Sequence, residues 1–167
     1  MKTVFSKRAQ NVILSDTQKS VILGTLLGDG YLVQTTRGYA LRVNHGIDQK
    51  KYVDWKHSIF KNIVNSKPAI YEDRNCYFRT VSHDYFSEMR NIFYHDRTKY
   101  IPREFLLQNL NPLSLAVWIM DDGSKDGNQM RLNTQSFSRE ENEELSRILN
   151  TTFGIQTTIN CDKDKYR

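Results

Sequence analysis

The sequence has few cysteines and prolines and no long apolar run. Cys76 and Cys161 are its only cysteines, and there is no Cys-x-x-Cys pair, which argues against a disulfide framework or a cysteine-based zinc site and indicates a reducing compartment. Three prolines leave no proline-rich linker. No segment approaches the roughly 20 consecutive apolar residues that cross a bilayer, and the N-terminus lacks a secretory signal. We therefore expect an intracellular protein with no membrane association.

Positive charge is concentrated in the first part of the chain. Residues 1–105 hold 17 Lys and Arg against 10 Asp and Glu, whereas residues 106–167 hold 7 against 9. A basic region favours a polyanion such as nucleic acid, because bound Lys and Arg release condensed counterions. The same excess also suits an ordinary soluble basic protein, so charge alone does not decide the class.

The pattern of the first hundred residues predicts the order α-β-β-α-β-β-α. An apolar helix over about 17–27, with Asp16 as its N-cap, ends at Gly28-Asp29-Gly30. Strand pairs are expected at 31–36 with 39–45 and at 68–72 with 76–81. A helix from about residue 49 and another over 85–93 follow from apolar residues at helical spacing, which in the first of these are Tyr52, Trp55, Ile59 and Ile63.

From residue 112 the pattern begins again. Pro112 suits the first turn of an apolar helix that ends at Asp121-Asp122-Gly123. A strand over 129–137, a helix opened by the capping box of Ser138 and Glu141, and a strand over 155–161 after Gly154 are expected next. This second copy stops about one strand and one helix short of the first. We expect an N-terminal arm at 1–15, a first half at 16–105 and a truncated second half at 106–167.

Each copy contains an apolar helix that leads directly into an acid and a glycine. Two helices that are apolar on nearly every face bury themselves most easily against each other, and Gly24 and Gly28 would let their backbones approach closely. This packing would bring Asp29 and Asp122 together at helix C-termini, where negative charge is unfavourable. A lone motif of this kind is usually a glycine-capped helix end, but the pair favours a shared Mg²⁺ site, which suits phosphodiester cleavage.

The windows 22–30 and 115–123 resemble the LAGLIDADG motif of homing endonucleases, in the form with two copies in one chain. The stretches 99–102 and 132–137 are also similar to that family. The resemblance implies an α+β homing-endonuclease fold with two pseudo-symmetric αββαββα-type halves joined at the motif helices, an antiparallel β-saddle that binds DNA, and here an incomplete second half. It also implies a metal-dependent double-strand cut at a long asymmetric DNA target, with Mg²⁺ or Mn²⁺ as cofactor.

The same resemblance implies roles for individual residues. Asp29 and Asp122 would be catalytic metal ligands, and Gly28 and Asp121, one position earlier, are the adjoining candidates for the metal site, although Asp121 has only a glycine as its counterpart. Lys99 would be a catalytic cation beside the scissile phosphate. Gln135 and His45 lie where the family has residues near its active site. A second basic residue would follow the final strand of the second half, which leaves unaided cleavage an open question.

Polar side chains on the expected strands suit contact with the DNA major groove, where Arg pairs with guanine and Asn or Gln with adenine. The candidates are Gln34, Thr36, Arg37, Arg42, Asn44, Arg74, Tyr77, Arg79, Gln129, Arg131, Asn133, Gln156, Thr158 and Asn160. In 129–135, the odd-numbered residues, Gln135 included, would share one face. A solvated sheet face is the alternative for any single residue.

Three functions remain open. A site-specific DNA endonuclease is the leading hypothesis, because the two motif acids Asp29 and Asp122 are intact. An intron-splicing RNA maturase, with host intron RNA as partner, and a catalytically inactive DNA-binding remnant are the alternatives. We expect a monomer unless the shortened half drives association, and an organelle (mitochondrion or chloroplast) or a phage or bacterial cytoplasm as its location.

Overall fold

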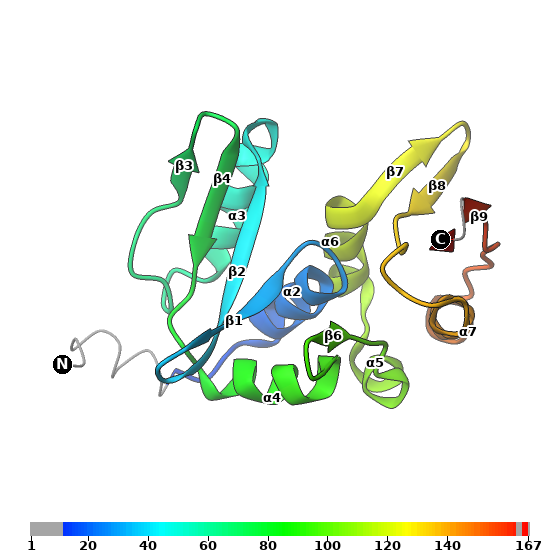
Figure 1. The fold of residues 1–167 in the computed structure, drawn as a ribbon, viewed down its shortest axis with the longest axis horizontal. Coiled ribbons are helices and arrows are strands. Elements are labelled where there is room, and N and C mark those ends of the chain that lie inside the picture. Colours follow the sequence, from blue (N-terminus) through cyan, green and yellow to red (C-terminus); the bar gives the residue numbers. More distant parts are fainter. Residues whose placement is uncertain (1–11, 163–164, 167) are drawn as a thin grey trace.

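The computed structural model describes residues 12–162 and 165–166. Two helices, α2 (Asp16–Leu27) and α6 (Pro112–Asp122), lie side by side at the centre, and antiparallel strands extend from each of them to opposite sides (Figure 1). Further helices cover the outer parts of both sides. The predicted α+β class with antiparallel sheets is confirmed.

The first side carries a four-stranded sheet of order β1-β2-β4-β3 with antiparallel neighbours. Its elements are β1 (Tyr31–Thr35), β2 (Gly38–Gly46), the short helix η1 (Ile47–Gln49), α3 (Lys50–Ile59), β3 (Ala69–Tyr71), β4 (Asn75–Arg79) and α4 (Asp84–Phe93). Leu41, Val43 and Phe78 turn to one face of this sheet and are buried in the core. The predicted order α-β-β-α-β-β-α is therefore confirmed for this part of the chain.

Two local predictions in this part were wrong. The N-cap of α2 is Ser15 and not Asp16, because the Ser15 hydroxyl accepts from the backbone N–H of Gln18 while the Gln18 side chain accepts from the backbone N–H of Ser15. The helix expected to run to Ile63 ends at Ile59, where the backbone N–H of Phe60 caps it. Ile63 is buried in the loop that follows.

The connection between the two sides contains elements that the sequence pattern left unassigned. A two-stranded ribbon of β5 (Tyr94–His95) and β6 (Thr98–Lys99) is followed by α5 (Arg103–Asn109), which packs against the later helix α7 (Arg139–Phe153). The predicted boundary between residues 105 and 106 falls inside α5. The division into halves and an N-terminal arm stays a prediction.

The second side also has four strands among the described residues, but they form two separate two-stranded ribbons instead of one sheet. After α6 come β7 (Gly123–Asp126), β8 (Gln129–Leu132), α7 (Arg139–Phe153), β9 (Cys161–Asp162) and β10 (Lys165–Tyr166), with β7 paired to β8 and β9 to β10. Ser138 and Glu141 form the predicted capping box of α7, and Gly154 ends it with φ +70°.

Two strand predictions in the second side were wrong. The strand expected over 129–137 ends at Leu132, because its partner β7 begins at Gly123 and the residues before Gly123 belong to α6. The segment expected as a strand at 155–161 is irregular up to Asn160. This segment follows α7, and its Thr157 hydroxyl donates to the hydroxyl of Ser146 on α7. Among the described residues, no strand pairs with the segment.

The contact between α2 and α6 holds the two sides together, as predicted. A Cβ atom added to Gly24 would lie 2.3 Å from the carbonyl oxygen of Ser114, and one added to Gly28 would lie 2.4 Å from Cβ of Asp121. Such distances leave no room for a side chain on α2 at either position. Both helices therefore approach at backbone contact, and their C-terminal ends meet.

Candidate active site and nucleic-acid interface

The two motif acids lie where the C-terminal ends of α2 and α6 meet. Asp29 follows the helix cap Gly28, and Asp122 is the last residue of α6. Burial, followed by the negative charges of Asp29 and Asp121, raises the pKa of Asp122 to about 7. The charge of Lys99 opposes this rise. The site thus gathers more negative charge than its own cations offset.

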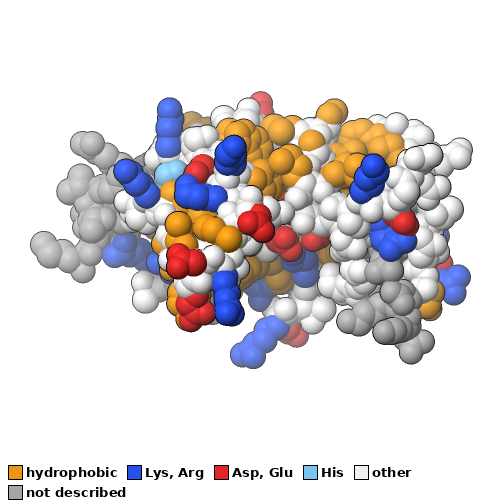
Figure 2. All heavy atoms as spheres, turned by 90° about the horizontal axis from the view of Figure 1, so that it is seen from above, with side chains coloured by type: hydrophobic (Ala, Val, Ile, Leu, Met, Phe, Trp, Pro, Cys, Tyr) orange, Lys and Arg blue, Asp and Glu red, His pale blue; other side chains and the backbone are white. Residues whose placement is uncertain are grey.

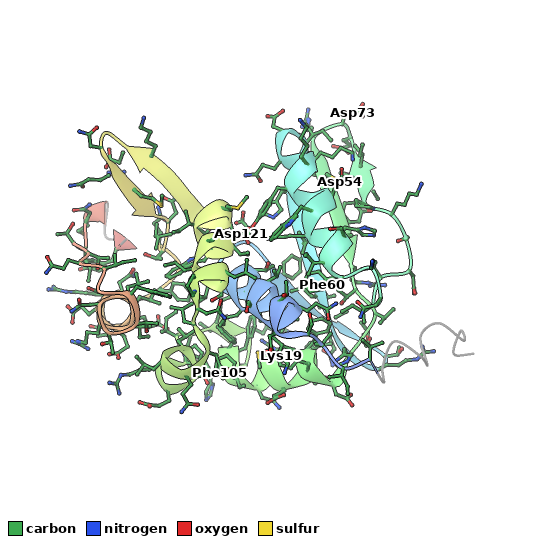
Figure 3. The ribbon with its side chains drawn as sticks, turned by 180° about the vertical axis from the view of Figure 1, so that it is seen from behind. Lys19, Asp54, Phe60, Asp73, Phe105 and Asp121 are labelled. Carbon is green, nitrogen blue, oxygen red and sulfur yellow. The ribbon has the colours of Figure 1, made fainter. Side chains whose placement is uncertain are left out.

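Asp121 is placed differently from Asp122. Its carboxylate is fully buried, with Lys56 Nζ at 2.7 Å from Oδ1 and 2.9 Å from Oδ2, and with the Tyr52 hydroxyl donating to Oδ1 at 2.7 Å. Burial raises the pKa of Asp121, and the charge of Lys56 opposes the rise. Figure 3 labels Asp121 on α6, seen from behind. Both carboxylate oxygens of Asp121 already bind protein groups, and in this respect Asp121 differs from the other predicted metal ligands.

His45 lies between the first acid and this buried pair. Its Nδ1 is 3.6 Å from Asp29 Oδ2, and its Nε2 is 3.8 Å from Asp121 Oδ1 and 3.4 Å from Lys56 Nζ. Burial and the nearby charge of Lys56 lower the pKa of His45 to about 4. A neutral imidazole therefore stands beside Asp29 at neutral pH, consistent with the expectation that His45 is near the site.

Lys99 reaches the site from the β5–β6 ribbon. Its Nζ donates to the carbonyl of Leu26 at 2.7 Å and, with longer contacts, to those of Gly28 at 3.3 Å and Gly30 at 3.4 Å. These carbonyls lie at the C-terminal end of α2, where helices leave acceptors unpaired. Burial lowers the pKa of Lys99, and the charges of Asp122 and Asp29 raise it. One lysine thus neutralises the end of α2 and faces both motif acids.

The donor atoms at this point suit a hard divalent cation. Within residues 12–162 and 165–166, no cluster of three or more His, Cys, Asp or Glu side chains could hold a metal ion on its own. Mg²⁺ usually takes one or two carboxylates and completes its shell with water and phosphate oxygens. Asp29 is half exposed, with 49% of its side chain open to solvent, and with Asp122 it offers this donor set. Gly28 could contribute only a carbonyl, which already faces Lys99.

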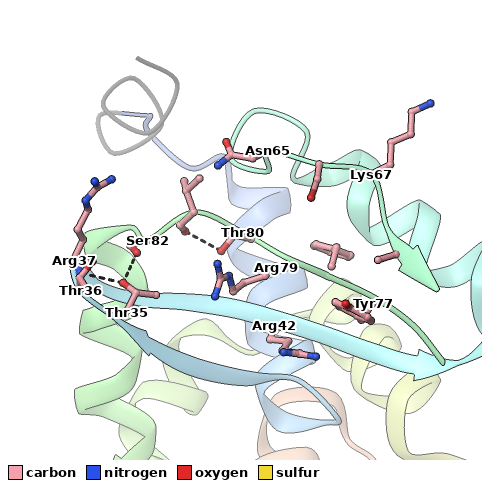
Figure 4. A pocket seen from close by; sticks show the side chains of 14 residues that line it. Thr35, Thr36, Arg37, Arg42, Asn65, Lys67, Tyr77, Arg79, Thr80 and Ser82 are labelled. Atoms are coloured by element: carbon pink, nitrogen blue, oxygen red, sulfur yellow. Dashed lines mark hydrogen bonds between the residues drawn. The ribbon is translucent and has the colours of Figure 1, made fainter. Parts of the chain in front are cut away.

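The open face of the four-stranded sheet collects several of the predicted DNA-binding residues. The register pairs Arg42 with Arg79 and Asn44 with Tyr77, so all four side chains lie on the same face, away from Leu41 and Val43. The guanidinium of Arg42 lies 4.7 Å from the centre of the Tyr77 ring. Figure 4 shows Arg42, Tyr77 and Arg79 along one groove.

This groove, of about 460 Å³, is lined by basic and hydroxyl side chains. Arg37 and Thr36 lie at one end and Lys67 at another (Figure 4). Among the described residues, no acid forms an ion pair with Arg37, Arg42, Lys67 or Arg79. Like charges directly opposite each other in a sheet are unfavourable, so the pairing of Arg42 with Arg79 favours an anionic ligand.

Two other candidates on this side lie apart from the groove face. Gln34 pairs with Tyr39 and so turns to the face that carries Leu32 and Leu41, opposite to Arg42. Arg74 is exposed in the turn between β3 and β4, where its carbonyl accepts from the backbone N–H of Ile47. The predicted strands at 68–72 and 76–81 already left Arg74 in the turn between them, whereas the face of Gln34 depends on the register of β1 with β2, which the sequence pattern does not show.

The second side presents its candidates less uniformly. Gln129 and Arg131 share a face of β8 as predicted, but Arg131 forms an ion pair with Asp126. Asn133 and Gln135 lie past the strand end, where the Asn133 amide donates to the Asp122 carbonyl at 2.8 Å and the Gln135 amide faces Asn133 Oδ1 at 3.5 Å. Gln156, Thr158 and Asn160 lie in the irregular segment and line a hollow beside α7 and β8.

Seen from above, the molecule shows several acidic side chains near the middle of one face, basic side chains to both sides of them, and further acidic side chains among the basic ones on the left (Figure 2). The described residues contain no helix long and apolar enough to span a membrane.

Sequence reasoning missed Lys56 and Tyr52 as site residues. Tyr52 had been assigned to the core of its helix, and Lys56 had not been singled out. One signal was available: Lys56 lies one turn after Tyr52, among the apolar positions of α3 that face inward. A lysine on an apolar stripe needs a buried partner.

Two apolar helices packed at backbone contact, with acids at their ends and antiparallel strands on both sides, form the centre of this architecture. The chain belongs to the LAGLIDADG DNA endonuclease family, whose sequence model matches residues 19–167. This confirms the resemblance drawn from the two motif windows.

Curated relatives extend this result. The chain is 40% identical over 126 residues to a protein named RecA of Mycobacterium gastri, covering 70% of this chain and 28% of that protein. It is 29% identical over 179 residues to probable intron-encoded endonuclease 1 of Wickerhamomyces canadensis, covering 98% and 78%. Cytochrome b mRNA maturase bI2 of Debaryomyces hansenii is 38% identical over 82 residues, which cover 49% of this chain and 31% of the maturase.

Solved structures share the fold. The homing endonuclease I-WcaI bound to its DNA recognition sequence superposes with a TM-score of 0.86 at 29% identity, covering 95% of this chain and 77% of that chain. A variant of I-DmoI, in complex with its nicked target DNA and in the presence of Mn, superposes with a TM-score of 0.53 at 18% identity, covering 90% and 86%. The second likeness shows the fold alone.

Proposed function

We propose that this chain is a site-specific endonuclease that makes a divalent-metal-dependent double-strand cut at a long asymmetric DNA target. The observation that carries the proposal is the meeting of Asp29 and Asp122 at the ends of α2 and α6, beside Lys99. The likeness to I-WcaI, which was solved with its DNA recognition sequence, supports DNA as the partner. The likeness to probable intron-encoded endonuclease 1 of Wickerhamomyces canadensis supports an intron-encoded origin, and an organelle stays the proposed location.

Asp29 and Asp122 would hold Mg²⁺ or Mn²⁺, and the bound cation would stabilise charge on the attacking and leaving oxygens of the phosphodiester. A variant of I-DmoI, which shares the fold, was solved in the presence of Mn, and this is consistent with use of a divalent ion. Lys99, held by the α2 carbonyls, presents a fixed positive charge next to the reacting phosphate. Gln135 stays a proposed catalytic residue near the second acid.

The chain's own residues would also bind and orient the DNA. The groove face carries Arg42, Arg79 and the neighbouring Arg37, which form no ion pair with an acid among the described residues. These arginines would contact phosphates or guanine edges. Different side chains on the two sides, a basic four-stranded sheet and a short ribbon with Gln129 and Arg131, would read an asymmetric target.

The test is cleavage of a supercoiled plasmid library that carries randomised inserts together with the I-WcaI recognition sequence. We expect linear product with defined ends in Mg²⁺ and none in excess EDTA. Equal cleavage with and without EDTA would contradict the metal dependence, and cleavage without defined ends would contradict site specificity.

RNA binding is a second candidate, because one relative is an mRNA maturase. In the same experiment, DNA binding without cleavage would indicate a catalytically inactive DNA-binding protein. Protection of an intron RNA, with neither DNA binding nor cleavage, would favour the maturase.

A further inference from the structure

A buried polar cluster joins the first side of the molecule to the second motif helix. Lys56 of α3 is fully buried, contacts both carboxylate oxygens of Asp121 on α6, and has its Nζ 4.5 Å from the centre of the Tyr52 ring. The Tyr52 hydroxyl oxygen also lies 3.2 Å from the carbonyl oxygen of Val117 on α6. These contacts connect residues 65 to 69 positions apart.

The cluster continues to the first motif acid. His45 lies between the two acids, with Nδ1 3.6 Å from Asp29 Oδ2 and Nε2 3.8 Å from Asp121 Oδ1. The backbone of Gly28 lies against the Asp121 side chain, since a Cβ at residue 28 would be 2.4 Å from Cβ of Asp121. Asp121 therefore packs against the residue that precedes Asp29 in the turn after α2.

Packing alone does not explain this arrangement. A buried ion pair loses much of its attraction to the cost of desolvation, and an apolar pair of similar volume is often as stable. Residues that touch metal ligands without touching the metal, in contrast, commonly fix the orientation of those ligands. The first copy has Gly28 where the second has Asp121, so one side chain fills the space at the helix crossing and its carboxylate reaches the opposite turn.

We propose that Lys56 is a positioning residue: through Asp121 it fixes the turn that carries Asp29 and so sets the Asp29 carboxylate for the divalent cation shared with Asp122. This inference rests on the proposed function. By this proposal, helix α3 of the first side helps to hold the metal site in place. Asp121 then has a role distinct from that of its neighbour Asp122.

The test separates positioning from stability with a double variant. Lys56→Met alone leaves a buried carboxylate without its cation, so it is expected to lower the melting temperature as well. Lys56→Met combined with Asp121→Leu replaces the whole pair by apolar side chains and should recover most of that loss. Lys50→Met is the matched control, because it removes an exposed lysine that pairs with Asp54 on the same helix.

Two quantities are measured for each full-length protein: the melting temperature and the affinity for Mn²⁺ alone, by electron paramagnetic resonance titration with Asp122→Asn as the blank. The double variant should fold with a melting temperature near that of the unmodified chain but bind Mn²⁺ at least about tenfold more weakly. Lys50→Met should change neither quantity. Tyr52→Phe, which removes one hydroxyl contact to Asp121, should weaken Mn²⁺ binding by a smaller factor, and it serves as the test if the double variant does not fold.

The failures of the two proposals are distinguishable. Absence of Mn²⁺ binding above the Asp122→Asn blank in the unmodified chain would contradict the proposed metal site, and the positioning role with it. Normal Mn²⁺ affinity in a folded double variant, or in Tyr52→Phe where only that variant folds, would overturn the positioning role of Lys56 and leave the metal site standing.

Discussion

The two sides of the molecule share one helix-and-hairpin plan but differ in what they add to it. The first side builds a four-stranded sheet whose groove holds arginines that form no ion pair with any acid of residues 12–162 and 165–166, whereas the second side shows a two-stranded ribbon in which Arg131 is paired with Asp126. Yet each side contributes one acid, Asp29 or Asp122, to the same point. Under the proposed function, both sides hold the cation, while DNA affinity depends mainly on the first side.

Removing one motif acid at a time should have the largest effect and tests whether both sides contribute to the site. Asp29→Asn and Asp122→Asn should each abolish cleavage and leave DNA binding intact or slightly tighter, because each removes a proposed metal ligand and a negative charge beside phosphate. Gel-shift affinity in Ca²⁺ and plasmid cleavage in Mg²⁺ check this. Unequal loss of cleavage in the two variants would show that the acids are not equivalent.

The lysine at the end of α2 should have the next largest effect. Lys99→Met keeps the aliphatic stem but removes the charge, and cleavage should slow by about 100-fold with little change in DNA affinity. Single-turnover rates at saturating protein measure this. The control is Lys125→Met, which removes an exposed lysine of β7. An equal, small effect of both variants would contradict a catalytic role for Lys99.

The helix crossing can be disturbed with a single methyl group. Gly24→Ala places a Cβ 2.3 Å from the Ser114 carbonyl oxygen, so it should destabilise the fold by about 1–3 kcal/mol although alanine favours helices. Gly46→Ala is the matched control, because its Cβ meets nothing within 4 Å. Chemical denaturation gives both values, and equal stability of the two variants would contradict the close approach of α2 and α6.

The smallest effect should distinguish the two sides in DNA binding. Arg42→Ala and Arg79→Ala should each lower affinity and reduce the salt dependence by about one ion, whereas Arg131→Ala should do so less, because its ion pair with Asp126 must first be broken. Fluorescence anisotropy over a salt series measures the slopes. Equal salt dependence of DNA affinity in all three variants would contradict the difference between the two sides.

Much of this architecture could be predicted from the sequence because its signals are local. The apolar windows that end at Asp29 and Asp122 predict both the helix pairing and the meeting of the acids. Ser138 and Glu141 predict the start of α7. Gly24 predicts the close crossing, since a residue without a side chain in an apolar helix allows backbone contact.

What the sequence did not predict depends on long-range contacts. The strand over 155–161 has a suitable pattern, but a strand needs a neighbour to pair with. Lys56 meets Asp121 across 65 residues, which no local pattern contains. Gln34 changes face through the register of β1 with β2, and register depends on the turn as well as on alternation.

The central claim, that the two sides share one cation between Asp29 and Asp122, is tested most directly by anomalous diffraction from crystals soaked in Mn²⁺. The account predicts a manganese peak that contacts both carboxylates and disappears in the Asp122→Asn variant. A peak on Asp121, a peak that contacts one motif acid only, or a peak unchanged in the variant would contradict it.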